Sequence, residues 1–395
     1  MSASTAKRRL RVLTMVDQIE GGGAEVLAGA IARHLDPERF QAILCVTRWE
    51  SGPAYEAIRE SYEAMRESFE LAGVRVIGLR RSGRVEVGEW RRLVGYMRSE
   101  RIDVLHTHML GSNFWGAVLS PVAGVPVFVA QEHGWSFEGT GWRRWVDRHV
   151  IARRADAFVT VSREDERRMI EVEKIPADKL RFIPSGIPTP APPSGADVRS
   201  ELGIDADAPV VGVVAGLRPP KALEVFIRAV DELRRKHPGL RALVIGPPHT
   251  NFVEEEKHLV ELTRELSLGD TMIFTGQRRD VPDLLAAMDV AVLSSDHEGS
   301  PLSVMEYMEA ARPVVATNVG GIPDLVVDGV TGILVPPRDP AALAAAISGL
   351  LGDPDLRRRL GEAGRDRRRS EFDISNTARR VEDLYEELYA LKRPG

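Results

Sequence analysis

Short apolar runs that alternate with helical stretches constrain the fold of this chain more than any other feature of its sequence. The runs are almost continuously apolar, and the stretches between them have the amphipathic pattern of helices. Strands of this kind are buried on both faces, which is typical of parallel sheets covered by helices on each side. We therefore predict an α/β protein with strands at residues 10–16, 40–47, 74–79, 104–106, 125–130, 158–162, 180–183, 210–215, 242–245, 272–274, 290–293, 314–317 and 333–335.

A proline-rich segment divides this pattern into two similar halves. Pro184–Gly195 holds five prolines and two glycines in twelve residues, which neither a helix nor a central strand accommodates. We interpret it as the linker between two doubly wound domains, residues 1–186 and residues 187–372. Residues 374–391 have the pattern of a final helix, and the basic run at residues 365–369 before it has the pattern of a solvated helix face.

The composition excludes several classes of protein. Of 395 residues, 43% are hydrophobic and 28% charged, which a disordered, collagen-like or disulfide-rich chain does not show. Cys45 is the only cysteine and lies in an apolar run, so we expect a buried thiol and a reducing compartment. No apolar run approaches the ~18 residues of a membrane span, and the apolar segment after the basic N-terminus is too short for a signal peptide. The net charge of −5 gives no nucleic-acid footprint, so we expect a cytoplasmic protein without a nucleic-acid partner.

Glycines and histidines follow several predicted strands of the first half. Gly22 and Gly23 lie in the loop after the first strand, where glycine lets the backbone approach a ligand; a simple tight turn is an equal alternative. The loop lacks the G-x-G-x-x-G spacing, which argues against a dinucleotide-dependent hydride transfer. His106 and His108 end one strand, and His133 follows the next. No cysteine or carboxylate cluster surrounds them at a metal-ligand spacing, so we expect no metal site and expect one of the first pair to pack in the interior.

Two cations open the second half. Arg218 and Lys221 lie between a predicted strand and the predicted helix Ala222–Lys236. Cations beside a helix N-terminus suit a diphosphate group. The alternative is a pair of solvated surface cations.

The most informative segment follows the predicted strand at residues 290–293. Glu298 lies in its loop, and Glu306 lies in the first turn of a helix that we expect to begin near Ser303. Backbone N–H groups at residues 300–304 would bind phosphate, and the carboxylates would accept hydrogen bonds from sugar hydroxyls. The structural alternative for Glu306 is a capping box with Ser303.

These motifs together resemble a known family. The eight-residue spacing of Glu298 and Glu306 is the Glu-x7-Glu motif of retaining glycosyltransferases with the GT-B fold. The chain resembles family-4, or group 1, glycosyltransferases over nearly its whole length, and the segments that carry the likeness are Gly22–Glu25, His106–His108, His133, Ala155–Asp156, Val161–Ser162, Arg218, Lys221, Glu298–Glu306, Pro313–Thr317, Val319–Asp324 and Asp328–Pro336.

The resemblance implies a fold and a set of roles. The fold would be GT-B, two Rossmann-like domains facing each other across a cleft, with residues 373–395 forming a helix that crosses back to the N-terminal domain. His133, Glu298, Arg218 and Lys221 would be catalytic, with His133 facing the reacting sugar. The donor would be held by Gly22, Gly23, Arg218, Lys221, Glu298, Gly299, Ser300, Pro301, Leu302, Ser303, Val304 and Glu306. No metal and no cofactor would be needed.

The activity that the resemblance implies is transfer of a hexosyl or N-acetylhexosaminyl unit from a UDP- or GDP-sugar to a hydroxyl acceptor, with retention. Synthesis of a cell-surface polysaccharide or glycoconjugate would be the setting. Two alternatives are a sugar-nucleotide epimerase on the same fold and a non-catalytic sugar-nucleotide-binding protein. The chain departs from the family at Ala222 and Arg312, where glycine is usual, and at Ser185–Pro188.

The acceptor is not readable from the sequence. Residues 141–154 mix tryptophan and arginine, which suits peripheral contact with the inner face of an anionic membrane that carries a lipid-linked acceptor. A packed helix with a basic solvent face is the favoured alternative.

Overall fold

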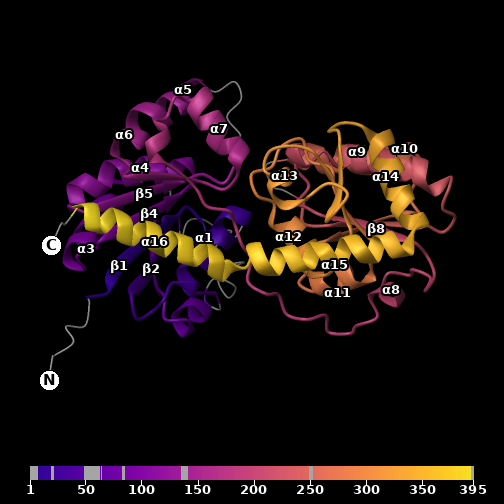
Figure 1. Cartoon of the computed structure of the whole chain (residues 1–395), viewed down its shortest axis with the longest axis horizontal. Helices are drawn as coiled ribbons and strands as arrows, with labels where there is room; N and C mark the ends of the chain where they lie inside the picture. The colour runs from indigo at the N-terminus through magenta and orange to yellow at the C-terminus, as the bar shows by residue number, and fades with distance from the viewer. Residues whose placement is uncertain are drawn as a thin grey trace. The chain divides into compact units, whose positions relative to one another are not determined.

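Two parallel β-sheets organise the chain (Figure 1), as a computed structural model shows. The structure describes residues 8–18, 22–48, 63, 65–81, 85–134, 141–248 and 252–392. The chain separates into two compact units, one made of residues 1–188 with residues 374–395 and the other of residues 189–373. The division falls inside the proline-rich segment.

The first unit holds a seven-stranded sheet in the order β3-β2-β1-β4-β5-β6-β7, all of whose pairings are parallel. Its strands are β1 (Leu10–Val16), β2 (Phe40–Val46), β3 (Arg75–Gly78), β4 (Val104–His108), β5 (Val127–Gln131), β6 (Ala157–Thr160) and β7 (Leu180–Phe182). Its helices are α1 (Gly23–His34), α3 (Val87–Ser99), α4 (Met109–Ala123), α5 (Gly141–Val146), α6 (Ala152–Arg154), α7 (Arg163–Glu171) and α16 (Ile374–Lys392), with a π-helical turn at Asp147–Ile151 and a 3₁₀ turn at Ala177–Lys179.

The second unit repeats the pattern with six parallel strands in the order β10-β9-β8-β11-β12-β13. Its strands are β8 (Val210–Val214), β9 (Arg241–Ile245), β10 (Met272–Gly276), β11 (Val290–Leu293), β12 (Val314–Thr317) and β13 (Gly332–Val335). Its helices are α8 (Val198–Glu201), α9 (Leu223–Arg234), α10 (Val253–Glu265), α11 (Val281–Ala287), α12 (Leu302–Glu309), α13 (Ile322–Leu325), α14 (Pro340–Gly352) and α15 (Pro354–Glu371), with a 3₁₀ turn at Pro219–Lys221.

The strands predicted from the apolar runs are all present, and both sheets have the order of a doubly wound fold, so the predicted fold class is confirmed. In each unit the strand order reverses at one place, between β1 and β4 in the first sheet and between β8 and β11 in the second. Ligands of such folds bind at the carboxyl ends of the strands beside this reversal.

Alternation along the strands explains why the runs are apolar throughout. On β2, Phe40 and Leu44 pack with α1 and α16, whereas Ile43 and Cys45 pack on the other face with α3 and α4. Cys45 is therefore a buried thiol, as expected, and burial raises its pKa to about 12.

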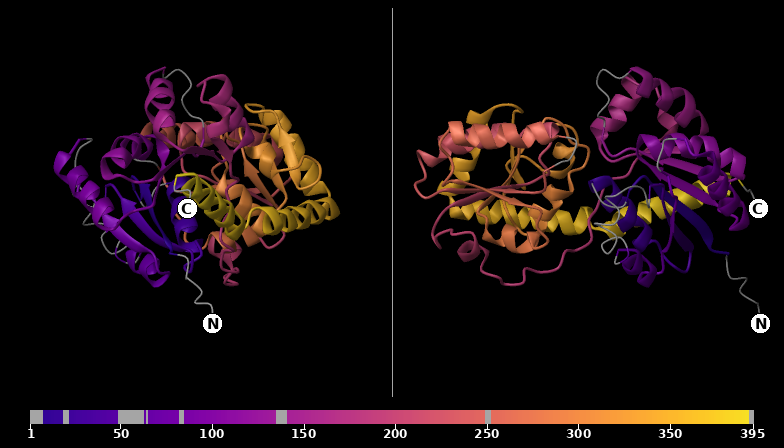
Figure 2. Two further views of the ribbon diagram at one scale, coloured as in Figure 1. Left: turned by 60° about the vertical axis from the view of Figure 1, so that its left-hand side comes forward. Right: turned by 180° about the vertical axis from the view of Figure 1, so that it is seen from behind.

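Helix α16 returns the chain to the first unit. It lies beside α1 (Figures 1 and 2), and its start is tied to the proline-rich segment, because Thr377 Oγ1 donates to the Pro184 carbonyl at 2.9 Å and Ile374 N to the Ile187 carbonyl at 3.1 Å. In the described part of the chain, no helix has both the length and the apolar character needed to cross a bilayer.

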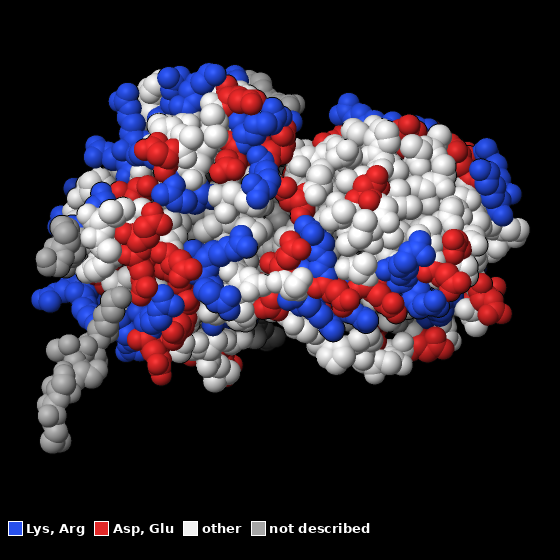
Figure 3. Space-filling model, in the orientation of Figure 1, with Lys and Arg blue, Asp and Glu red and all other residues white. Residues whose placement is uncertain are grey.

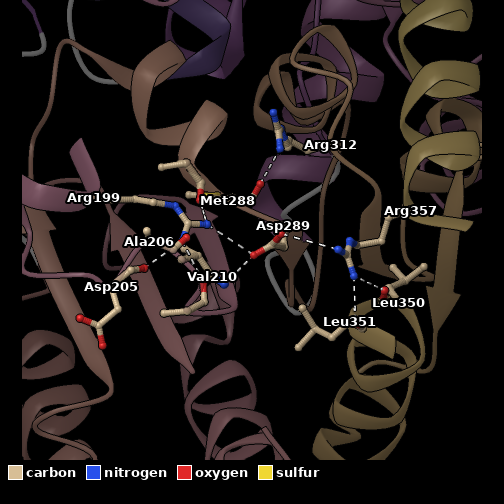
Figure 4. A network of polar contacts seen from close by, with 12 residues as sticks. Arg199, Asp205, Ala206, Val210, Met288, Asp289, Arg312, Leu350, Leu351 and Arg357 are labelled. Carbon is tan, nitrogen blue, oxygen red and sulfur yellow. Dashed lines mark hydrogen bonds and ion pairs between the residues drawn. The ribbon is translucent and has the colours of Figure 1, made fainter. Parts of the chain in front are cut away.

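A carboxylate braces the second unit at the amino end of β11, the end opposite the strand-end loops (Figure 4). Asp289 accepts a 2.9 Å hydrogen bond from Val210 N at the start of β8 and lies between the guanidinium groups of Arg199, at 3.6 Å, and Arg357, at 3.8 Å. Arg312, which replaces the expected glycine, donates to the Met288 carbonyl at 2.6 Å. The left-handed backbone lies one residue earlier, at Ala311.

The prediction that residues 365–369 form a solvated face is wrong for Arg368. Its side chain is fully buried, and its guanidinium pairs with Glu309 on α12 at 3.1 Å and with Asp373 at 3.6 Å. Arg369, its neighbour, is 56% exposed and pairs with the same Glu309 at 2.7 Å. A charge run in sequence does not reveal which member points inward, because that depends on what packs against α15.

We expect Arg368→Met to destabilise the protein by about 3 kcal/mol, because it removes the buried cation between Glu309 and Asp373 and leaves Glu309 only the exposed Arg369. Arg369→Met is the matched control, since an exposed ion pair contributes roughly 0–1 kcal/mol. Urea unfolding of both variants measures the difference. Equal free energies of unfolding for the two variants would show that the buried ion pair stabilises the protein no more than the exposed one.

Candidate functional site

The loops after β8 and β11 bring most of the predicted site residues together. These two strands are neighbours in the second sheet, so their carboxyl ends lie side by side. The loop after β8 carries Arg218 and Lys221, and the loop after β11 carries Glu298 and leads into α12. Asp296 N donates to the Pro220 carbonyl at 2.9 Å, which joins the two loops directly.

An ion pair between Lys221 and Glu298 forms the centre of this group. The Lys221 ammonium donates to Glu298 Oε1 at 2.6 Å, and the two side chains are only 15% and 10% exposed. The sequence assigned these residues to separate parts of a ligand and did not reveal that they neutralise each other. Because both charges are largely removed from water, each needs the other or a ligand of opposite charge.

Neighbouring residues hold Glu298 in place. Ser295 Oγ donates to Glu298 Oε1 at 2.6 Å, and Thr317 Oγ1 fixes the Ser295 carbonyl at 2.6 Å. Gly320 has a left-handed backbone, φ 54°, and a side chain there would lie 1.9 Å from the Glu298 carbonyl oxygen. Only glycine fits at residue 320, so the motif at residues 319–321 allows its loop to approach the loop of Glu298 closely.

Helix α12 begins at Leu302, one residue before the predicted start. Pro301 precedes it, and no side chain caps its first turn, so the alternative of a capping box between Ser303 and Glu306 does not hold. The helix is anchored instead by Tyr307, whose hydroxyl accepts from Val214 N at 2.6 Å at the end of β8. Uncapped N–H groups at a helix start are available to an anion.

Glu306 lies on the second turn of α12, partly buried, with no hydrogen bond or ion pair to any described residue. Burial raises its pKa to about 7. Two further polar atoms nearby are buried without a partner in the described structure, Ser300 Oγ and His297 Nε2. Unsatisfied buried polar groups cost stability, and their concentration in one loop indicates a site built for something other than folding.

Arg218 and Ala222 flank Lys221. Arg218 is partly buried and makes no ion pair or hydrogen bond with the described residues, so its guanidinium is available. Ala222 has φ 45° and ψ 45°, the left-handed conformation that favours glycine, which explains why glycine is usual there. Alanine adopts it at a cost of roughly 1–2 kcal/mol.

The remaining predicted site residues belong to the first unit. Gly22 is the residue before α1 and Gly23 begins it, and no side chain caps this helix start. A side chain at Gly22 would lie 2.8 Å from the Glu25 carboxylate. His133 follows β5 and precedes Gly134.

His133 is part of a row of three histidines. His108 Nδ1 lies 2.9 Å from His133 Nε2, and the His106 ring packs on the His108 ring with centroids 4.3 Å apart. His106 Nδ1 lies 2.6 Å from the Tyr385 hydroxyl on α16. The prediction of an interior histidine is confirmed for both members of the first pair, which are fully buried.

Two carboxyl groups in this part of the first unit have raised pKa values. Burial and nearby Asp147 raise the pKa of Glu132 well above its usual range, and Glu132 accepts from Asn113 Nδ2 at 2.8 Å. Burial likewise raises the pKa of Asp147 to about 8. The first unit therefore presents largely uncharged groups near His133.

Comparison with known families finds two matches that together cover most of the chain. Residues 196–367 match the family described as glycosyl transferases group 1. Residues 21–190 match glycosyltransferase family 4.

Curated relatives carry glycosyltransferase names. A D-inositol 3-phosphate glycosyltransferase of Acidothermus cellulolyticus is 31% identical over 310 residues, which cover 74% of this chain and 68% of the relative. An alpha-maltose-1-phosphate synthase of Mycolicibacterium smegmatis is 30% identical over 321 residues, or 74% and 81%. A Nocardia farcinica D-inositol 3-phosphate glycosyltransferase is 33% identical over 221 residues, and the chain spans about half of that relative, 49%.

Solved structures share the whole architecture. HepE of Anabaena, in complex with UDP and glucose, superposes with a TM-score of 0.83 at 21% identity over 96% of this chain and 100% of that one. Sucrose-phosphate synthase of Thermosynechococcus elongatus superposes with a TM-score of 0.78 at 23% identity over 97% and 100%. At these identities the likeness establishes the fold.

We expect Glu306→Gln to stabilise the protein at pH 8 and not at pH 5. Because the folded state raises the pKa of Glu306 from 4.5 to about 7, stability falls as the pH rises through this interval. The uncharged amide avoids this loss, roughly 2–3 kcal/mol at pH 8. Urea unfolding at both pH values measures it. A variant less stable than the wild type at pH 8 would contradict the raised pKa of Glu306.

Proposed function

The chain belongs to the group 1 glycosyltransferases, and we propose that it transfers a sugar from a nucleotide-diphosphate sugar to a hydroxyl group of an acceptor, with retention of configuration. The proposal rests on a cluster of charged side chains and free N–H groups that lies where β8 and β11 end. It combines Arg218, the Lys221–Glu298 pair and the uncapped start of α12. These are the charges and N–H groups that a diphosphate linked to a sugar requires.

The ion pair is central to donor binding in this proposal. The diphosphate takes over the Lys221 ammonium and meets the available Arg218 guanidinium. Glu298 is then released toward the hydroxyls of the sugar, still held by Ser295. Lys221 exchanges one anionic partner for another, and Glu298 keeps hydrogen-bond partners, so both buried charges remain compensated. A sugar without a diphosphate does not supply the anion for this exchange.

Glu306 binds the ribose hydroxyls in this proposal. Its carboxylate has no protein partner in the described structure, so the two hydroxyls of a ribose supply the missing hydrogen bonds. The N–H groups of Gly299, Ser300, Leu302 and Ser303 hold sugar and phosphate oxygens, whereas Pro301 has no N–H and Val304 N donates to the Pro301 carbonyl at 3.2 Å. Ionised Glu306 is the better acceptor, so donor affinity falls as the pH drops below 7.

In the reaction, the bond between the sugar C1 and the diphosphate oxygen breaks and a bond between C1 and the acceptor oxygen forms on the same face. The acceptor proton passes to the departing phosphate oxygen. Negative charge grows on the diphosphate, where Arg218, Lys221 and the helix N–H groups stabilise it. These protein groups stabilise the negative charge of the diphosphate, so no step needs a divalent cation. His133, Gly22 and Gly23 of the first unit are further donor-binding residues in this proposal, which for them rests on the family resemblance.

The relatives guide the choice of substrates. By name they glycosylate D-inositol 3-phosphate or make alpha-maltose 1-phosphate, so small phosphorylated polyols and sugars are the first acceptors to test. These names give no particular support to cell-surface polysaccharide synthesis. HepE was solved with UDP-glucose, which makes UDP-glucose the first donor.

We expect Glu298→Gln to lower kcat about 100-fold, because Glu298 faces the sugar whose charge changes in the transition state. Glu306→Gln should raise the donor KM about tenfold with a smaller change in kcat, since its hydrogen bonds exist before and during the reaction. Initial rates with radiolabelled UDP- and GDP-sugars, with and without EDTA, measure both. The matched control is Asp296→Asn, in the same loop, whose carboxylate pairs with the exposed Arg338.

The same assay separates the alternatives. Donor isomerised without an acceptor would indicate an epimerase. Donor binding in a thermal shift without turnover across the acceptor panel would favour a binding protein. Wild-type kinetics in both glutamate variants would contradict the site assignment, and activity abolished by EDTA and restored by Mn²⁺ would contradict the charge argument.

We also propose that α5 and the turn after it contact an anionic membrane surface. Trp142 and Trp145 are 61% and 59% exposed, and none of the residues of α5 is buried, so the tryptophans are not the packed face of a helix. Arg148, Arg153 and Arg154 are exposed without a carboxylate partner in the described structure, and Figure 3 shows basic side chains gathered over α5 and α6. Exposed tryptophan beside arginine suits the interface of an anionic bilayer.

We expect the wild type to float with phosphatidylglycerol liposomes at low salt and not with phosphatidylcholine liposomes. Replacing both tryptophans by serine should reduce the floated fraction at least fivefold, because their apolar rings would no longer insert. Val85→Ser with Val87→Ser is the control, since these apolar residues of the same unit are 68% and 54% exposed. No flotation of the wild type at low salt would exclude the membrane contact.

A further inference from the structure

The three histidines form a continuous row from α16 to the loop after β5. Tyr385 of α16 bonds to His106, the His106 and His108 rings contact each other with an interplanar tilt of 34°, and His108 bonds to His133. His133 is the member at the strand end where the proposed function places the sugar. His106 and His108 are buried in the interior of the first unit.

All three imidazoles are neutral at physiological pH. Burial lowers the pKa of His106 and of His133 to about 3, and burial together with the other two rings lowers the pKa of His108 well below its usual range. Each ring therefore carries one N–H and one lone pair.

The positions of these protons follow from hydrogen-bond counting. His108 Nδ1 faces His133 Nε2 at 2.9 Å, so one of the two nitrogens donates and the other accepts. His108 Nε2 is buried and has no hydrogen-bond partner in the described structure. If the proton of His108 were on Nε2, a buried N–H would be unsatisfied, which is rarer and more costly than an unused lone pair. The proton therefore lies on Nδ1 and is donated to His133 Nε2.

We propose that His108 is a positioning residue that keeps His133 in the tautomer with its proton on Nδ1. His133 then presents an uncharged N–H donor, suited to a sugar hydroxyl oxygen or a phosphate oxygen of the donor substrate. This inference rests on the proposed function of His133. His106, held by Tyr385, supports the His108 ring from behind and prevents it from turning away.

The described residues around the row do not have the arrangement of a metal site. In the described part of the chain no group of His, Cys, Asp and Glu side chains has the arrangement that could hold a metal ion. The 2.9 Å separation of the facing nitrogens is that of a hydrogen bond.

Nitrogen-15 NMR of histidine-labelled enzyme tests the tautomer directly, because protonated and unprotonated ring nitrogens have well-separated shifts. We expect the His133 Nδ1 to be protonated in the wild type and in His108→Asn, whose amide N–H replaces the imidazole donor. In His108→Leu, which has no donor, we expect a mixture of tautomers and a kcat lowered at least tenfold, with the donor KM changed less than twofold. His237→Leu, in the second unit, is the control for loss of a histidine elsewhere.

The outcomes are distinct. A wild-type His133 protonated on Nε2, or a His108→Leu variant with wild-type tautomer and kcat, would overturn the inference. If His133→Ala itself retains the wild-type kcat, the proposed role of His133 fails, whatever its tautomer. If His108→Leu does not fold, the wild-type spectrum and the retained kcat of His108→Asn still decide.

Discussion

Burial of both sheets on both faces is the constraint on which the rest of the structure depends. A strand such as β2 sends alternate side chains into two different apolar layers, so neither face has room for polar chemistry. Apart from a few buried strand residues such as Thr14 and His106, polar and charged groups gather at the ends of the strands. At the amino ends they act structurally, as Asp289 does between two arginines, and at the carboxyl ends they form the candidate site.

The candidate site is assembled at the expense of stability. In the described structure Glu306 is partly buried without a partner, Ala222 has a backbone that alanine disfavours, and the polar atoms of Ser300 and His297 are unsatisfied. Such groups persist when a ligand uses them. The Lys221–Glu298 pair limits the cost, because each charge compensates the other until a diphosphate replaces the carboxylate.

The first unit contributes an uncharged hydrogen-bond donor, His133. Burial keeps the three histidines uncharged, and the aromatic and hydrogen-bonding contacts from Tyr385 to His133 determine how the rings face one another. Because Tyr385 belongs to α16, the C-terminal helix contributes to the environment of a residue at the end of β5 as well as to the apolar core.

The sequence by itself determined the fold class, every strand, the proline-rich division and the loops that carry Arg218, Lys221, Glu298 and His133, because apolar periodicity and strand-end motifs are local patterns. It did not determine that Arg368 is buried, that Lys221 pairs with Glu298, that Tyr307 rather than a capping box anchors α12, or that His108 bonds to His133. Each of these joins residues from different elements. Only the tertiary structure decided them, because which side chains meet depends on how strands and helices pack, and the same charged or aromatic residue is exposed in one packing and buried in another.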